Sequence, residues 1–154
     1  MAKPSEISIR PLAWDDREEW SNLWSDYLAF YETSVSDEIK ATYFGRLLGN
    51  DPQDFNALVA VDGARLVGLV HYLFHRHGWI VANTCYLQDL YARPDVRGRG
   101  IGRALIEAVY AAADAAGAAK VYWQTQHTNR TARQLYDRVG QLTPFIVYQR
   151  GATA

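Results

Sequence analysis

The sequence of 154 residues has a single cysteine, Cys85, and no apolar run approaching the roughly 20 residues that span a bilayer. One cysteine excludes an internal disulfide framework and favours a reducing compartment, so we expect Cys85 to be a buried small hydrophobe. The N-terminal stretch MAKPSEISIRP lacks the apolar segment of a secretory signal. We therefore expect a cytoplasmic protein with no membrane partner.

An excess of either charge is also missing. The chain has 16 basic and 17 acidic residues and a formal net charge of -1, so it has no overall positive field to attract nucleic acid. We accordingly expect no nucleic-acid partner. Repeats, low-complexity tracts and Pro/Gly/Ser-rich linkers are absent as well, and 49% of the residues are hydrophobic. Length and composition together predict one folded domain over residues 1–154.

Hydrophobic periodicity predicts an α/β fold, with a mixed sheet that carries helices on both sides. The expected element order is βααβββαβαβ. Asp62-Gly63 between two apolar runs indicates a β-hairpin within residues 55–74. The other strands are expected at 6–12, 79–92, 120–126 and 145–150, and the helices at 14–31, 37–48, 102–116 and 129–139.

The stretch RGRGIGR, residues 97–103, lies between an expected strand and an expected helix. Glycines there would let an anion approach the backbone N–H groups at the helix start. The stretch lacks the lysine of a phosphate-binding P-loop, and Arg103 stands where a dinucleotide fingerprint has its third glycine. Two interpretations remain at this point: an anion-binding loop, or a tight connection whose glycines only turn the chain.

A second group of residues opens the last expected helix. Asn129, Ala132 and Tyr136 are spaced i, i+3 and i+7, which places them on one helical face. The amide would lie at the start of the helix and the phenol about two turns further along. Ala132 and Tyr136 also have the spacing of core residues, so packing is the alternative interpretation.

Together these two patterns resemble the GCN5-related N-acetyltransferase (GNAT) superfamily. Its acetyl-CoA signature, Arg/Gln-x-x-Gly-x-Gly/Ala after the fourth strand, is matched by Arg97, Gly100 and Gly102. Its Asn-x6-Tyr signature after the fifth strand is matched by Asn129 and Tyr136. The stretch CYLQDLYARPDVRGRGIGRALI, residues 85–106, is similar to the diamine and histone/polyamine acetyltransferase branch. The resemblance covers essentially the whole chain.

The resemblance implies a GNAT acyl-CoA N-acyltransferase fold with a V-shaped split between the fourth and fifth strands. Acetyl-CoA would be the co-substrate, and no metal would be needed. The acetyl and pantetheine groups would pair with the fourth strand, and the pyrophosphate with the loop that follows it. The implied coenzyme-binding residues are Leu90, Tyr91, Ala92, Arg97, Gly98, Arg99, Gly100, Ile101, Gly102, Arg103, Asn129 and Ala132.

The resemblance also implies that an amine attacks the thioester directly in a ternary complex. Tyr136 would then donate a proton to the departing CoA thiolate, for which a phenol has a suitable pKa. Several relatives carry a glutamate base on the fourth strand, where this chain has Gln88. Glutamine cannot accept a proton, so we consider three routes: a water oriented by Gln88, neighbouring Asp89 as the carboxylate, or attack by the small free-amine fraction. Gln88 and Asp89 would share a face only if a bulge intervenes.

The expected acceptor is a primary amine of a small molecule, such as a polyamine, a lysine-like amine or another cationic amine. Tyr31, Glu32 and Asp37 are candidates to bind it, although the acidic residues could equally form an ordinary solvated surface. We interpret the histidines of HYLFHRHGW, residues 71–79, as a solvated hairpin tip, because metal-site spacing is lacking. A homodimer is expected because dimers are common among relatives. The alternative function is an acyl-CoA-binding regulatory module without turnover.

Overall fold

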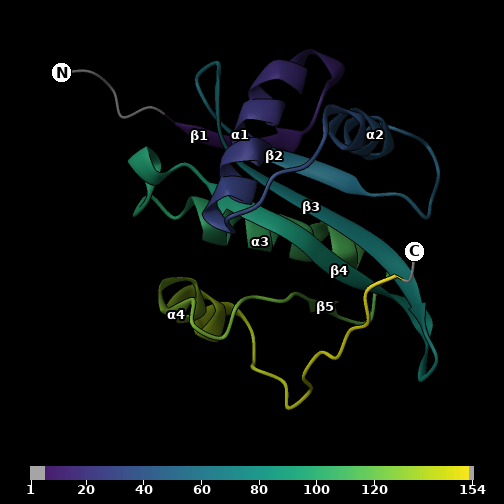
Figure 1. The fold of residues 1–154 in the computed structure, drawn as a ribbon. Coiled ribbons are helices and arrows are strands. Elements are labelled where there is room, and N and C mark those ends of the chain that lie inside the picture. Colours follow the sequence, from purple (N-terminus) through teal and green to yellow (C-terminus); the bar gives the residue numbers. More distant parts are fainter. Residues whose placement is uncertain (1–5, 153–154) are drawn as a thin grey trace. The chain divides into compact units, whose positions relative to one another are not determined.

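The computed structural model describes residues 6–152 (Figure 1). These residues fall into two compact parts, which meet between Gln124 and Thr125. The larger part contains one sheet and three α-helices, and the smaller part contains one α-helix. Each part is described by itself below. No helix among the described residues is both long and apolar enough to cross a membrane.

The larger part is built on a five-stranded sheet whose spatial order follows the chain. Neighbouring strands from β1 to β4 are antiparallel, and β4 and β5 are parallel. The strands are β1 (Ile7–Pro11), β2 (Asn56–Asp62), β3 (Arg65–His77), β4 (Ile80–Ala92) and β5 (Val121–Tyr122). The helices are α1 (Arg17–Phe30), α2 (Asp37–Leu47) and α3 (Ile101–Ala115), with short 3-10 turns at Trp14–Asp16 and Pro94–Val96. This mixed α/β architecture confirms the predicted fold class.

The predicted hairpin is present between β2 and β3. Asp62, the last residue of β2, pairs with Arg65, so Gly63 and Ala64 form the turn, and Gly63 of the predicted Asp62-Gly63 dipeptide has a φ of +64°. Such a conformation is easily reached only by glycine or a few short polar residues, which explains why the dipeptide sets the register here.

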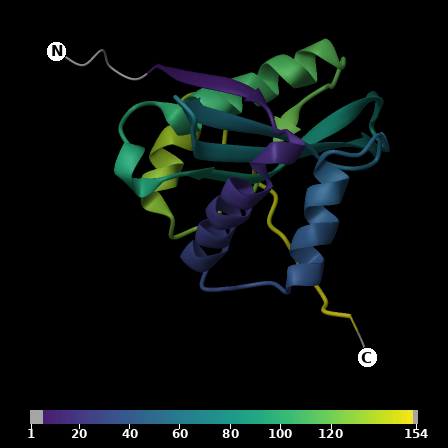
Figure 2. The ribbon, with the colours of Figure 1, turned by 90° about the horizontal axis from the view of Figure 1, so that it is seen from above.

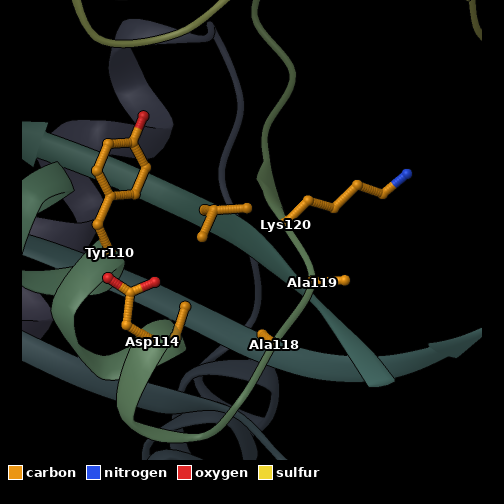
Figure 3. Close-up of a pocket in the computed structure, with 7 residues that line it drawn as sticks. Tyr110, Asp114, Ala118, Ala119 and Lys120 are labelled. Atoms are coloured by element: carbon orange, nitrogen blue, oxygen red, sulfur yellow. The ribbon is translucent and has the colours of Figure 1, made fainter. Parts of the chain in front are cut away.

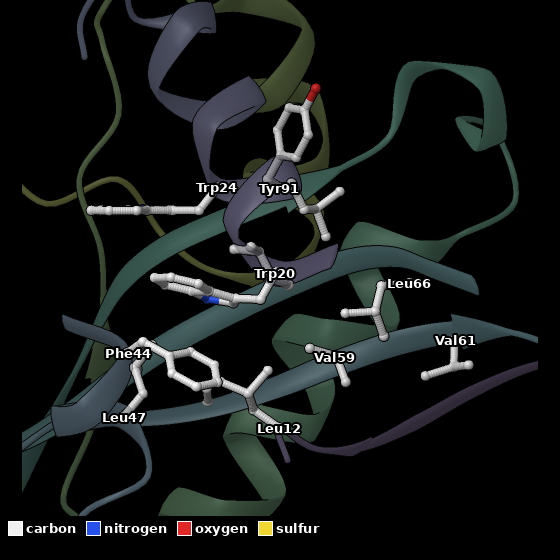
Figure 4. Packing of buried hydrophobic residues seen from close by; sticks show 12 residues of the cluster. Leu12, Trp20, Trp24, Phe44, Leu47, Val59, Val61, Leu66 and Tyr91 are labelled. Carbon is white, nitrogen blue, oxygen red and sulfur yellow. The ribbon is translucent and has the colours of Figure 1, made fainter. Parts of the chain in front are cut away.

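Helices α1 and α2 cover one face of the sheet, and α3 covers the other (Figures 1 and 2). The core on the first face is rich in aromatic rings, with Trp20, Trp24 and Phe44 from the helices lying over the strands (Figure 4). Trp20 and Trp24 stack at a centroid distance of 5.3 Å, one helical turn apart. This packing holds α1 against β3 and β4, and α2 against β2.

On the opposite face, a glycine lets α3 approach β3 closely. A Cβ on Gly68 would lie 2.9 Å from Ile101 Cγ2 and 3.1 Å from Leu105 Cδ1, too close for an ordinary contact. Gly68 is also the register partner of Ala92, the last residue of β4. The missing side chain therefore brings the first turns of α3 against the end of the β4 strand.

Two predicted strands differ from the structure. The strand expected at 120–126 is only two residues long, Val121–Tyr122. The strand expected at 145–150 is wrong, because that segment has no regular structure. A strand needs a hydrogen-bonded neighbour, and apolar sequence alone does not supply one. The smaller part has one regular element, α4 (Arg130–Val139).

Candidate functional site

The glycine-rich loop ends in a backbone conformation that opens the start of α3. Gly98 and Gly100 have φ values of +83° and +75°, and Gly100 is the N-cap of α3. A Cβ added at either glycine would meet nothing within 4 Å, so the space beside this backbone is open. The first N–H groups of a helix have no intrahelical acceptor, and they carry the positive end of the helix dipole. The loop therefore has the geometry of an anion-binding site.

The strand that leads into this loop, β4, has one edge that is unpaired beyond Tyr86. β5 pairs with β4 only at Cys85 and Tyr86, and among residues 6–152 no other strand pairs with that edge of β4. The Arg93 N–H donates to the Val67 carbonyl at 2.8 Å, which points it toward β3. Because these directions alternate along a strand, the N–H and C=O groups of Leu90 and Ala92 point toward the free edge, whereas those of Tyr91 point toward β3.

The arginines of the loop have different partners. Arg99 pairs with Asp62 at 3.1 Å, and Arg103 pairs with Glu107 at 2.8 Å, one turn further along α3. Both pairs lie at the surface, where such pairs contribute little and exchange readily. An anionic ligand at the start of α3 would compete with these carboxylates for the guanidinium groups.

A hydrogen-bonded chain of buried side chains lies between α1, α2 and the sheet. Trp20 Nε1–H donates to His71 Nε2 at 3.0 Å, and His71 Nδ1 lies 2.8 Å from Asp89 Oδ2. An indole can only donate, so His71 Nε2 must accept and its proton must be on Nδ1. His71 therefore donates to Asp89 through Nδ1, and Asp89 also accepts a bond of 2.6 Å from the Tyr43 hydroxyl.

These bonds determine the charge of Asp89, which is only 6% exposed. Burial acts to raise the pKa of its carboxyl group, but hydrogen bonding and electrostatic attraction from His71, followed by the bonds from Tyr43 and Tyr27, hold the pKa below the ordinary value. The pKa values of Tyr43 and Tyr27 are raised, chiefly by burial and then by the Asp89 charge. Asp89 is therefore ionised at neutral pH and surrounded by phenols that keep their protons.

Gln88 and Asp89 open onto the same space because the strand is irregular between them. His71 pairs with Asp89 and Tyr72 with Leu87, which leaves Gln88 as the extra residue of a β-bulge. Both Gln88 and Asp89 line a cavity of about 780 Å³ under α1 and α2. The sequence analysis required a bulge for Gln88 and Asp89 to share a face, and the structure contains that bulge.

The wall of this cavity is mostly apolar and aromatic, with a few charged groups. It comes from α1, the connection to α2, one face of α2 and the bulge of β4. Of the predicted acceptor-binding residues, Tyr31 lines the cavity, whereas Glu32 and Asp37 do not. The charged residues in the wall are Glu38, Arg46 and Asp89.

The histidines differ from the predicted solvated hairpin tip. His71 is fully buried, and the interpretation is wrong for it, because Asp89 and Trp20 satisfy both ring nitrogens. His75 is half-buried, and its Nε2 lies at a hydrogen-bond distance of 2.7 Å from the Tyr122 hydroxyl. Among residues 6–152 no three histidine, cysteine or carboxylate side chains are grouped as a metal site would require.

Sequence reasoning missed the roles of Trp20, His71 and Tyr43. Asp89 lies 18 residues from His71 and 46 from Tyr43, so no local spacing signals the cluster. Cys85, by contrast, is buried as predicted, and burial raises the pKa of its thiol to about 11.

In the smaller part, Asn129 is the N-cap of α4. Its side-chain oxygen accepts from the Ala132 N–H at 3.4 Å, and its amide nitrogen donates to the Thr125 hydroxyl at 3.4 Å. Tyr136 lies on the same helix and is half-buried. Their predicted roles toward the coenzyme stay predictions.

A second, smaller hollow of about 330 Å³ lies where the end of α3 leads into β5. Three alanines, Val121 and the side chains of Tyr110, Asp114 and Lys120 line it. The Lys120 ammonium points away from the Asp114 carboxylate (Figure 3). Its polar groups do not converge, so the cavity under α1 and α2 is the better candidate for chemistry.

Comparison with known proteins agrees with this geometry. The chain matches the model of the Acetyltransferase (GNAT) family over residues 10–141. It is 35% identical over 145 residues to the D-amino-acid N-acetyltransferase HPA3 of Saccharomyces cerevisiae, covering 94% of this chain and 90% of that protein. It is 33% identical over 124 residues to the thialysine N-epsilon-acetyltransferase of Sus scrofa, covering 73% of this chain and 71% of that one.

Solved structures show the same fold at low sequence identity. A structure of AAC(6')-Iy with the bisubstrate analog CoA-S-monomethyl-acetylneamine superposes with a TM-score of 0.84 at 17% identity, covering 97% of this chain and all of that one. An aminoglycoside acetyltransferase from an uncultured soil metagenomic sample gives a TM-score of 0.77 at 21% identity, with 96% of each chain covered. The family model and the 35%-identical yeast relative show that the chain belongs to the GNAT family of acetyltransferases. It is an N-acetyltransferase.

Proposed function

We propose that this enzyme transfers the acetyl group of acetyl-CoA to a primary amine of a small molecule. The observation that carries the proposal is the free edge of β4, which runs directly into the open, glycine-rich start of α3. The names of the yeast and pig relatives, which refer to D-amino acids and thialysine, support an amine acceptor.

The coenzyme would lie along this edge. Backbone N–H groups at Gly98 to Arg103 would bind the pyrophosphate, with charge from Arg97, Arg99 and Arg103. The outward-facing backbone groups of Leu90 and Ala92 would pair with the pantetheine and acetyl parts. An N–H donor there would also stabilise the oxyanion that forms when the amine attacks the thioester.

Two protons must move during the reaction. The attacking ammonium must lose one, and Asp89 is a poor acceptor because its pKa is already lowered. We infer that Asp89 attracts the cationic amine into the cavity, and that a water held at Gln88 carries the proton away. Tyr136 would supply a proton to the leaving CoA thiolate.

The test is a thiol-release assay with acetyl-CoA and a panel of amines: polyamines, lysine, other amino acids and aminoglycosides. Release of CoA that depends on an added amine, together with an acetylated product of the expected mass, would support the proposal. Tight binding of acetyl-CoA with no release for any amine would refute it and favour a regulatory module without turnover.

A further inference from the structure

The acceptor cavity contains one basic side chain in an otherwise apolar and acidic wall. Arg46 is exposed in the last turn of α2 and lines the cavity together with Glu38 and Asp89. Several other arginines, such as Arg10 and Arg65, pair with carboxylates, but Arg46 forms no ion pair or hydrogen bond with another side chain among residues 6–152. A free guanidinium in a ligand cavity is suited to bind a carboxylate with two parallel hydrogen bonds.

The position of Arg46 relative to Asp89 follows from the helix. Ile39, Tyr43 and Arg46 recur at i, i+4 and i+7, so they share the face of α2 that lines the cavity. The Tyr43 hydroxyl reaches Asp89 directly, at 2.6 Å. Arg46 is three residues further on, roughly 4.5 Å along the helix axis. The Arg46 guanidinium can therefore reach the part of the cavity that Tyr43 and Asp89 line.

A second donor in the wall also lacks an acceptor. Trp24 lines the same cavity, and its Nε1–H is buried without a hydrogen-bond partner among the described residues. Leaving a buried donor unpaired costs about 1–3 kcal/mol. An acceptor oxygen brought in by a ligand would reduce that cost, whereas a second ammonium group would not.

We propose that the acceptor is an α-amino acid whose carboxylate binds Arg46 while its amino group lies at Gln88 and Asp89. This inference rests on the proposed acetyl transfer and names its substrate class. In an α-amino acid one carbon separates the two charged groups, which suits a wall that holds both a cation, Arg46, and an anion, Asp89. A polyamine would instead bring a second positive charge toward Arg46. The apolar lining, including Leu28, Val35 and Phe55, favours an amino acid with an apolar or aromatic side chain.

The experiment compares three amines of similar size: phenylalanine, phenylalanine amide and phenethylamine. Both enantiomers of the amino acid are used, and kcat/KM is expressed per unprotonated amine so that different amine pKa values do not bias the result. We expect the wild-type enzyme to prefer phenylalanine, in at least one enantiomer, by roughly ten- to a hundredfold, as a charge-assisted bond predicts.

The Arg46→Ala variant should lose this preference. Its kcat/KM for phenylalanine should fall by roughly ten- to a hundredfold, mainly through KM, while the value for phenethylamine stays within about twofold. Arg46→Lys keeps the positive charge but cannot form two parallel hydrogen bonds. Its kcat/KM for phenylalanine should lie between those of the wild type and Arg46→Ala. Lys40→Ala is the matched control, because it removes a positive charge from the same helix at a residue outside the cavity wall.

Three results would overturn the inference and leave acetyl transfer intact: no preference for the carboxylate in the wild-type enzyme, equal losses for acid and amine in Arg46→Ala, or activity with polyamines only. Absence of CoA release with every amine would instead refute the proposed function, and the carboxylate site would fall with it. Thermal unfolding of each variant, expected within a few degrees of the wild type, shows that the losses do not come from misfolding.

Discussion

Replacement of Tyr43 by phenylalanine tests the buried network around Asp89. The substitution removes one hydroxyl and keeps the ring, which contacts Trp24 and Phe55 at centroid distances of 4.8 and 4.9 Å. The lost interaction is the 2.6 Å bond to the ionised Asp89. Bonds to charged groups contribute about 1.5–3 kcal/mol, and we expect about 1.5–2 kcal/mol here because Asp89 keeps its bond from His71.

The loss should depend on pH in a defined direction. The pKa of Asp89 in the folded protein lies below the ordinary value of 3.8, so the stabilisation from its ionised form is complete above 3.8 and is lost as the pH falls through the lower folded value. Tyr43→Phe moves the folded pKa back toward 3.8. The difference in unfolding free energy between wild type and variant should therefore be largest at neutral pH and narrow under acid conditions.

Urea unfolding over a pH series measures this difference. Tyr72→Phe is the control, since Tyr72 is only 8% exposed and its hydroxyl forms no hydrogen bond with another described residue. It should change the unfolding free energy by less than about 0.5 kcal/mol at any pH. The charge-assisted network would be refuted if Tyr43→Phe lowered the unfolding free energy by the same amount at every pH, or by no more than the control does.

Three further predictions concern other parts of the molecule. Gly68→Ala should cost about 1–3 kcal/mol in thermal or urea unfolding and weaken acetyl-CoA binding, because its Cβ would press against Ile101 at 2.9 Å; unchanged affinity would show that α3 can shift harmlessly. Tyr136→Phe should lower kcat by roughly a hundredfold with acetyl-CoA affinity nearly unchanged, and equal turnover would exclude the phenol as the proton donor. Cys85 should react slowly with iodoacetamide at neutral pH, since its thiol pKa is raised to about 11, and Cys85→Ala should keep full activity; rapid labelling of the folded enzyme would contradict its burial.

Local sequence determined the secondary structure wherever a short-range physical rule applied. Asp62-Gly63 fixed the hairpin, and apolar spacing predicted the four α-helices, whose bounds differ from expectation by a few residues. The segment 145–150 failed because strand formation depends on a hydrogen-bonded partner elsewhere in the chain, which composition does not encode.

The glycine pattern after β4 could be read from the sequence for the same reason. Gly98 and Gly100 have positive φ values, a local backbone requirement that restricts the residue type. The acceptor side is different. Asp89 was visible only as a possible carboxylate beside Gln88, and the bulge that turns both into one cavity arises from pairing between β3 and β4.

By itself, the sequence determined the fold class, the hairpin and the glycine-rich start of α3, because each follows from residues close together in the chain. Only the tertiary structure decided that Asp89 is a buried anion held by His71 and Tyr43, and that Arg46 shares its cavity. Charge state and ligand preference depend on groups that folding brings together from positions far apart along the chain, and burial then fixes which of them stay ionised.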